Sequence, residues 1–420
     1  MTSTLDHLAP IDLPQFGLGP HYAATKVRMC AEPLSTDVEV MRRLAEFERL
    51  LGRRPTTLFT QLTDRPGTVL LGHPYPRAVL LAALGTDEGH WLDEVAARLA
   101  GPAPAPAAGA RPALTELPGL SALPIIRHRP GDVGRYVTAG VGVTTRPDRD
   151  GVNLGIYRIQ VVGEHEARIF LDPRTDGHAN LGAWTDVGEP MPISVFLGAD
   201  PVHMMVAASR LPARDGAALD NVEDDYRVAG MLLGRAVRTH GSPPVPESAT
   251  HVLHATVRPE LAREGPFGEF KGYYAEERMS NVLDVWEVLA APGAPMPTIL
   301  AGGESGLTLM SMQNEYLMYA HLTEIGVPVR TVHYPLPARG EFLALVETDE
   351  PTREVLAEAM RFDVRSKVVV CGPDLKSIWQ ALATHGFSSR VEPYLRKGRV
   401  EGERLGLLLD IPPTGRPVEY

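Results

Sequence analysis

The sequence predicts a multidomain protein that combines α/β and α+β architecture, and three observations carry this prediction. The chain has 420 residues, more than one domain usually holds, and its 44% of hydrophobic residues suffices for sizeable cores. From about Leu123 it shows short β-like runs broken by Gly, Pro and Asp. From about Thr298, apolar runs of strand length alternate with helical patterns, which is typical of an α/β domain.

The amino-terminal part is predicted to contain the first clear helix. A helical period follows Thr36, and Thr36 and Glu39 have the spacing of a capping box. Gly52 is a typical helix stop. Residues 55–100 have the pattern of a strand, a turn and a helix. The segment Ala100–Leu120 is rich in Ala, Pro and Gly and is the best linker candidate.

The remaining elements follow from periodicity and turn residues. We expect a strand pair over 151–162 and 166–171, further strands over 191–198 and 251–257, and a helix over 224–236. A three-layer α/β region should contain helices over 313–325, 352–361 and 375–385, and strands over 327–332, 341–347 and 367–371. Residues 302–306 (GGESG) lack the Lys-Ser/Thr ending of a phosphate loop, so we interpret them as a loop over a pocket.

Composition excludes several classes of protein. Lys and Arg number 41 and Asp and Glu number 52, so the net charge of −11 argues against a nucleic-acid partner. Two cysteines with no paired spacing, Cys30 and Cys371, make a disulfide framework and a cysteine metal site improbable. No stretch has the pattern of a signal peptide or a membrane helix. We therefore expect a cytoplasmic protein without a membrane partner.

Two carboxylates and one guanidinium form the most informative group of residues. Glu264 and Glu269 are five positions apart in EGPFGE, and Arg158 lies in NLGIYRIQ about a hundred residues earlier. Gly265 and Pro266 disfavour a helix, whereas a turn can bring both acids to one point beside the planar fork of an Arg. One such acid, held protonated near neutral pH, can donate a proton. The alternative is a pair of ordinary solvated turn acids.

Five segments occur in an order that identifies a family. They are Leu123-Pro124 with RPGD at 129–132, NLGIYRIQ at 153–160, FLGADP at 196–201, the stretch from Asp225-Tyr226 to Pro246, and EGPFGE at 264–269 followed by GYY at 272–274. Over about 150 residues they resemble the UbiD-type decarboxylases, the group that contains 3-octaprenyl-4-hydroxybenzoate decarboxylase and ferulic acid decarboxylase.

The resemblance implies a central flavin-binding split β-barrel domain over 116–297. An α/β domain over 1–115 and a three-layer α/β domain over 298–420 would flank it, the latter mediating homo-oligomerisation. It also implies prenylated FMN as cofactor, a flavin prenyltransferase as its supplier, and reversible non-oxidative decarboxylation of an unsaturated or aromatic carboxylic acid. A cofactor is needed because the carbanion left by carbon dioxide loss is too costly to form unaided.

Site residues carry over position by position from the resemblance. Glu269 would be the proton donor, and Glu264 and Arg158 would orient it and tune its proton affinity. The cofactor contacts would include Thr138, Asn153, Ile156, Tyr157, Arg158 and Ser209.

The expected metal site departs from the family pattern. The family holds the cofactor phosphate through a divalent ion (Mn or Mg) and potassium, with Asn, His and Glu as ligands of the divalent ion. Asn153 is present, but the His position falls near Arg174 and the Glu position near Thr239 or His240. Because a guanidinium cannot ligate a metal, Arg174, with His240 or Arg210, would meet the phosphate directly. Alternatively, His178 is the ligand after a small insertion, or the site is damaged and binds no prenylated flavin.

Two other functions stay open from the sequence. A non-catalytic relative could serve as a subunit or as a flavin- or phosphate-binding partner. The same scaffold could also carboxylate its substrate or use an unprenylated flavin.

Overall fold

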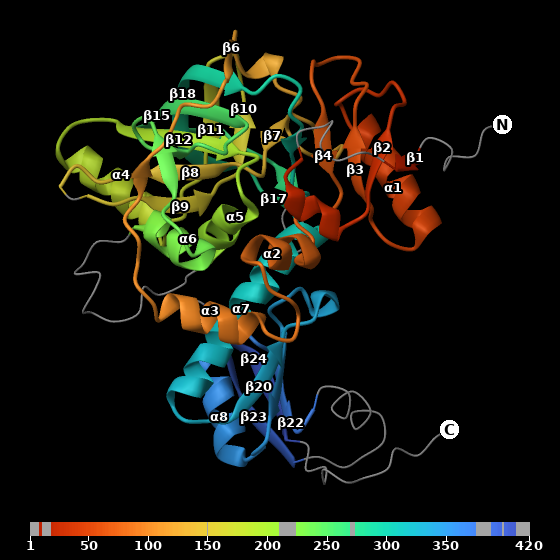
Figure 1. Ribbon diagram of the computed structural model, residues 1–420, viewed down its shortest axis with the longest axis vertical. Helices are drawn as coiled ribbons and strands as arrows, with labels where there is room; N and C mark the ends of the chain where they lie inside the picture. The colour runs from red at the N-terminus through yellow and green to blue at the C-terminus, as the bar shows by residue number, and fades with distance from the viewer. Residues whose placement is uncertain are drawn as a thin grey trace. The chain divides into compact units, whose positions relative to one another are not determined.

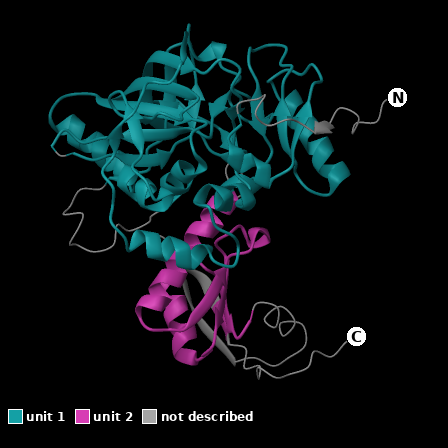
Figure 2. Ribbon diagram, viewed as in Figure 1, with its two compact units in different colours: residues 1–306 teal, residues 307–420 magenta. Residues whose placement is uncertain are grey.

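The computed structural model describes residues 8–10, 18–148, 150–209, 224–268, 274–374, 388–396 and 399–408. It divides into two compact units, residues 1–306 and 307–420 (Figure 2). The boundary near 115 that was expected inside the first unit stays a prediction.

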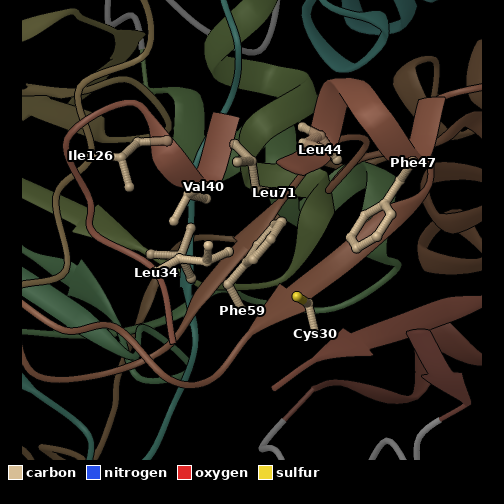
Figure 3. Close-up of a cluster of buried hydrophobic side chains, with 9 residues drawn as sticks. Cys30, Leu34, Val40, Leu44, Phe47, Phe59, Leu71 and Ile126 are labelled. Atoms are coloured by element: carbon tan, nitrogen blue, oxygen red, sulfur yellow. The ribbon is translucent and has the colours of Figure 1, made fainter. Parts of the chain in front are cut away.

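The amino-terminal part of the first unit is built on a five-stranded sheet with the order β1-β2-β3-β4-β19. The strands are β1 (Leu8–Pro10), β2 (Val27–Cys30), β3 (Thr56–Phe59), β4 (Val69–Leu71) and β19 (Met296–Pro297). Helix α1 (Glu39–Leu51) lays its apolar face on this sheet, with Val40, Leu44 and Phe47 packed against Phe59 and Leu71 (Figure 3). This burial fixes the helix that the sequence predicted.

The start of α1 differs from the expected capping box. Its N-cap is Val38 in the left-handed region, with φ 62° and no side-chain cap. The Thr36 backbone N–H and hydroxyl both donate to the carboxylate of Asp64, at 2.7 and 2.8 Å. The Glu39 carboxylate instead accepts from the Ser35 N–H at 2.7 Å. The capping-box prediction is therefore wrong, because Thr36 donates its hydrogen bonds to Asp64, a residue distant in sequence.

Short helices and strands follow, and the expected linker is not a free segment. The further helices of this part are η3 (Pro20–Ala24), α2 (Arg77–Leu84), α3 (Trp91–Leu99) and η4 (Leu120–Ala122). Within Ala100–Leu120, β5 (Ala107–Ala108) pairs with β13 (Arg238–His240), and β6 (Thr115–Leu117) pairs with β18 (Arg278–Ala290). The linker prediction is wrong because both short strands join sheets formed by later residues.

The largest sheet curls into a half-barrel (Figure 1). Its path is β7-β10-β11-β18-β15-β12-β8-β9, with β6 attached to β18. The further strands are β7 (Tyr136–Val137), β8 (Val141–Thr144), β9 (Asn153–Ile156), β10 (Ile159–Val161), β11 (Glu166–Ile169), β12 (Met191–Leu197) and β15 (His251–Glu264). Small sheets pair β13 with β14 (Val245–Pro246), and β16 (Phe267–Gly268) with β17 (Tyr274–Ala275).

The connection between β9 and β10 explains why this sheet curls. The two strands lie near opposite ends of the sheet path, yet only Tyr157 and Arg158 separate them. Three residue steps span at most about 11 Å, so the ends of the path must come close together. The single long strand expected over 151–162 is therefore two strands, and Arg158 lies at the seam between them.

Strands β15 and β18 form the longest ladder and contain two irregularities. The register runs from His251 opposite Ala290 to Glu264 opposite Arg278. Trp286 has no partner, because His254 faces Glu287 and Ala255 faces Val285. Further along, the register shifts again between Val257 and Leu261. Such bulges turn a strand and re-aim its side chains.

Three helices accompany the half-barrel: α4 (Asp176–Asp186), α5 (Pro201–Ala208) and α6 (Asp225–Leu233). The last of these confirms the helix expected over 224–236. Asp200 and Asp224 cap α5 and α6 by accepting the N–H groups of Val202 and Tyr226.

The second unit is an α/β structure around the sheet β20-β21-β22-β24-β23. Helix α7 (Glu304–Glu324) crosses the boundary into this unit. The other elements are β20 (Val329–His333), η5 (Leu336–Ala338), β21 (Leu343–Thr348), α8 (Arg353–Phe362), β22 (Val368–Gly372), β23 (Ser388–Arg396) and β24 (Arg399–Leu408). These bounds confirm the expected alternation, and the helix expected over 375–385 lies outside the described residues. The loop expected over 302–306 is wrong in part, because α7 begins at Glu304.

Candidate functional site

Arg158 and Glu264 meet in the interior of the half-barrel region. A guanidinium Nη2 of Arg158 lies 2.7 Å from Oε2 of Glu264. The side chains are 15% and 1% exposed, respectively. The seam between β9 and β10 positions the arginine, and the last residue of β15 supplies the acid. The pairing expected from segments about a hundred residues apart is therefore present, as a short charge-assisted hydrogen bond.

The Glu264 carboxylate keeps one oxygen available. Oε2 also accepts from the Ser280 hydroxyl at 3.2 Å, whereas the buried Oε1 has no hydrogen-bond partner among the described residues. Burial, and secondly the charge of Glu264, raises the pKa of the neighbouring Tyr136 phenol. A buried polar atom without a hydrogen-bond partner is unusual in a native protein, so Oε1 remains an acceptor that a ligand could use.

Neighbouring residues hold the backbone that follows Glu264. Oε1 of Gln160 accepts the Gly265 N–H at 3.1 Å and the Tyr136 hydroxyl at 3.3 Å. The next peptide, Gly265–Pro266, is cis. The acid therefore ends a paired strand and does not sit in a free turn.

Aromatic rings lie beside the cation of this pair. The Arg158 guanidinium carbon lies 5.3 Å from the Phe170 ring centroid and 5.6 Å from that of Phe267. Arg278 approaches the same Phe170 ring at 4.5 Å. These contacts hold the guanidinium beside the aromatic rings and restrict its movement.

A clamp formed by Arg129 and Asp132 holds Gly268, the residue before Glu269. The buried Asp132 carboxylate accepts the Gly268 N–H at 2.9 Å, and its other oxygen accepts the Arg129 N–H at 2.8 Å. The Arg129 guanidinium donates to the Gly268 carbonyl at 2.8 Å and to the Ala301 carbonyl at 2.6 Å. Glu269 itself lies outside the described residues. The clamp fixes the position from which the chain continues to it.

A second polar group surrounds the start of β9. Asn153 donates its amide to Thr144 Oγ1 at 3.1 Å and to the Tyr157 hydroxyl at 3.4 Å, and Asn180 of α4 donates to the same Thr144 at 2.9 Å. A Cβ on Gly177 would lie only 2.1 Å from the Tyr157 oxygen. Burial raises the pKa of Tyr157 to about 12. Because both amides donate to Thr144, the carbonyl oxygen of Asn153 remains an available acceptor.

The residues predicted to contact the phosphate or a metal differ in burial. His178 follows Gly177 on α4, and its Nδ1 is buried without a hydrogen-bond partner among the described residues. Arg174 is 76% exposed and forms an ion pair with Asp172, with Nη2 2.7 Å from Oδ2. Its hydrogen bonds lower the pKa of Asp172 to about 2. Whether Arg174 reaches a phosphate stays a prediction.

The other predicted cofactor contacts are placed as follows. Thr138 is buried, with its hydroxyl 3.4 Å from Nε2 of His128. Ile156 pairs with Val141 in the sheet, and Ser209 donates its hydroxyl to the Val206 carbonyl. His240 lies on β13, and Arg210 lies outside the described residues. Burial lowers the pKa of His240.

Two absences concern the described part of the chain. No group of three or more His, Cys, Asp and Glu there is arranged to hold a metal ion, although Asn ligands fall outside that criterion. None of the described helices has an apolar stretch of the length that a bilayer requires.

Several residues of the site were missed by the sequence reasoning. Ser280 and Phe170 carried no local signal, and Gln160 stood in the recognised NLGIYRIQ segment without any indication that it contacts Gly265. Arg129 and Asp132 stood in the recognised RPGD segment, but nothing in the sequence indicated that they hold Gly268.

Comparison with known proteins finds a family model that matches the part of the chain containing this site. Residues 104–304 match the family model UbiD, described as the 3-octaprenyl-4-hydroxybenzoate carboxy-lyase Rift-related domain.

Similar solved structures include three UbiD-class or decarboxylase enzymes. An evolved dimeric form of HmfF from Pelotomaculum thermopropionicum, in complex with prFMN, matches with TM-score 0.79 and 20% identity over 94% of each chain. Apo 3,4-dihydroxybenzoic acid decarboxylase (AroY) from Klebsiella pneumoniae matches with TM-score 0.77 and 18% identity over 91% of this chain and 90% of that one. Vanillic acid decarboxylase from Sedimentibacter hydroxybenzoicus, in closed form, matches with TM-score 0.71 and 20% identity over 94% and 91%. At these identities the matches establish a shared fold.

Proposed function

We propose that this chain, which belongs to the UbiD-type decarboxylase family through residues 104–304, catalyses the reversible non-oxidative decarboxylation of an unsaturated or aromatic carboxylic acid. The observation that carries the proposal is the buried pair of Arg158 and Glu264, 2.7 Å apart, with Oε1 of the acid left without a partner. Such an arrangement is costly unless a function uses it.

Prenylated FMN is the proposed cofactor, and the residues present fit it. The unpartnered Oε1 of Glu264 and the available oxygen of Asn153 are acceptors for a polar ligand. When bound, the cofactor supplies an electron sink for the bond that loses carbon dioxide. HmfF structures with prFMN and with FMN share the fold.

Proton transfer is the task assigned to the chain's own residues. Glu269 donates the proton that replaces carbon dioxide, and in sequence it stands five residues after Glu264 and directly after the clamped Gly268. The charge of Glu264 favours a protonated Glu269, and the Arg158 cation limits this effect. The clamp on Gly268 holds the backbone directly before the proposed donor.

The polar group at Asn153 is the proposed phosphate end of the cofactor site. The Asn153 oxygen and Nδ1 of His178 are the available ligands for Mn or Mg, because neither has another partner among the described residues. Arg174 is a weaker candidate for a direct phosphate contact, since it is exposed and paired with Asp172.

The remaining features of the proposal follow from the family. The substrate is a small carboxylic acid, a flavin prenyltransferase supplies the cofactor in the cytoplasm, and the chain forms a homo-oligomer. The second candidate function is a non-catalytic flavin- or phosphate-binding subunit. It is favoured by the exposure of Arg174, which pairs with Asp172.

The test is to express the chain with and without a flavin prenyltransferase. Bound flavin is recorded by absorption and mass, and aromatic and acrylic acids are screened for carbon dioxide release. We expect Glu269→Gln and Glu264→Gln to retain the flavin and to lose at least about a hundredfold in turnover, the lower end for an acid–base group. Glu260→Gln is the matched control, because Glu260 is exposed and lies on β15 like Glu264, and it should leave turnover unchanged.

The outcomes separate the two candidates. Flavin binding without turnover on any acid supports the non-catalytic subunit. Full activity of Glu269→Gln contradicts its assignment as proton donor, and no flavin binding in any preparation contradicts both candidate functions that need it.

A further inference from the structure

A basic cavity lies in the amino-terminal part of the first unit, and it shares no lining residue with the Arg158–Glu264 site. Its volume is about 380 Å³, within the range of small-molecule sites. The charged or titratable side chains in its wall are Lys26, Arg28, Arg53, Arg54, His73 and Glu304.

The fold brings these residues together from four places in the chain. Arg28 lies on β2, and Arg53 and Arg54 follow the left-handed Gly52 that ends α1. His73 follows Gly72, whose φ is +91° and where a Cβ would lie 2.0 Å from the Pro55 carbonyl oxygen. Only glycine permits this approach, which places His73 beside the segment that contains the arginines.

The charges in the basic cavity do not balance. Arg54 is paired with Glu48, with Nη2 2.6 Å from Oε2. Lys26, Arg28 and Arg53 form no ion pair with any described residue, and Glu304 is the one carboxylate in the wall. Among the described residues, the three cations without an ion pair and this acid leave an excess of about two positive charges, a potential that attracts an anion.

His73 provides an independent sign of a ligand. Its side chain is 10% exposed, and its Nδ1 has no hydrogen-bond partner among the described residues. Oε2 of Glu304 lies 3.6 Å from Nδ1, beyond hydrogen-bond distance. Burial, and secondly Arg54, lowers the pKa of His73 to about 4, so the ring is neutral at neutral pH. A neutral imidazole with an unused ring nitrogen can donate to a ligand oxygen.

We propose that the basic cavity binds a phosphorylated small molecule, as a site separate from the decarboxylation site. The dianionic charge of a phosphate monoester matches the excess of two positive charges. Arginine forks suit the spacing of phosphate oxygens, and the volume leaves room for an attached organic group.

The test is isothermal titration calorimetry on the full chain at low salt, with sodium pyrophosphate and inorganic phosphate as probes. Citrate serves as the carboxylate arm. We expect saturable binding of pyrophosphate at one site per chain, weaker binding of phosphate, and the weakest binding of citrate. Affinity should fall steeply between about 50 and 200 mM salt.

Variants locate the binding. Arg28→Gln together with Arg53→Gln should weaken pyrophosphate binding at least about tenfold, since each lost charged hydrogen bond costs that much or more. Arg49→Gln, an exposed arginine on α1 outside the basic cavity, is the matched control and should bind like the original chain. His73→Asn changes no net charge at neutral pH, and it should also weaken binding if the site is built as described.

Each result decides the proposal. No binding by the original chain, or unchanged binding by the double variant, overturns it. An equal loss in Arg49→Gln also overturns it, because it shows attraction to general surface charge. Citrate binding more tightly than pyrophosphate overturns the assignment to phosphate. Circular dichroism spectra confirm that each variant is folded, and flavin content, measured separately, keeps this result distinct from the decarboxylase test.

Discussion

The clamp on Gly268 gives the sharpest test of how the site is held. In Asp132→Asn, one of the two backbone N–H groups now bound by the carboxylate would face an amide NH₂ group. A hydrogen bond to a charged group is worth about 1.5–3 kcal/mol, and an unsatisfied buried donor costs about 1–3 kcal/mol. Burial raises the pKa of Asp132, so the neutral amide recovers part of the desolvation cost. We expect a net loss of about 2–3 kcal/mol.

Two measurements read out this change. Urea unfolding gives the free energy of unfolding, and hydrogen exchange should show faster exchange of the Gly268 amide. If Glu269 is the proton donor, turnover should fall at least about tenfold, with a smaller change in KM, because the donor is less well positioned. Asp284→Asn is the matched control: this half-exposed aspartate pairs with Arg258 on the surface, and its loss should cost less than about 1 kcal/mol.

The reasoning about the clamp would be refuted by a folded Asp132→Asn protein with a stability loss under about 0.5 kcal/mol and unchanged Gly268 exchange, since the two backbone bonds would then carry no weight. A stability loss with unchanged turnover would keep the structural role and reject the link to proton donation.

Two further predictions concern buried groups. Gly177→Ala should destabilise the chain by about 1–3 kcal/mol, because its Cβ would overlap the Tyr157 oxygen. In a double-mutant cycle measured by urea denaturation, Tyr157→Phe in the same chain should restore part of this loss. Additive losses in stability would reject the contact. Burial, and secondly Arg129, lowers the pKa of His128 to about 3, so the unfolded chain binds the extra proton below its ordinary pKa of 6.5. The free energy of unfolding should therefore fall by about 1.4 kcal/mol per pH unit as the pH drops from about 6.5 toward the pKa of the folded state. In His128→Gln, the free energy of unfolding, measured by urea denaturation at several pH values, should depend less steeply on pH.

The sequence predicted the elements whose signals are local. The helix ending at Gly52, the strand over 191–198 and the alternating elements after about 327 needed only periodicity and turn residues. The pairing of Arg158 with Glu264 was predictable because whole segments occur in a recognised order. Predictions were wrong where a residue distant in sequence decides the local structure, as Asp64 does when it accepts a hydrogen bond from the Thr36 hydroxyl.

The rest of the site depends on sheet register, which a single sequence does not display. Ser280 reaches Glu264 only because β15 and β18 pair with two irregularities, and the break at Tyr157 is visible only once β9 and β10 are assigned to separate places in the sheet. The clamp likewise joins residues that are 136 positions apart.

The unpaired Trp286 has an evolutionary consequence. If this residue took a regular place in the ladder, every residue of β18 from Arg278 to Val285 would move one step along β15, and Ser280 would turn to the opposite face, away from Glu264. Natural variation in β15 and β18 is therefore constrained in length as well as in residue type. An insertion or deletion in one strand would be inherited only together with a compensating change in the other strand.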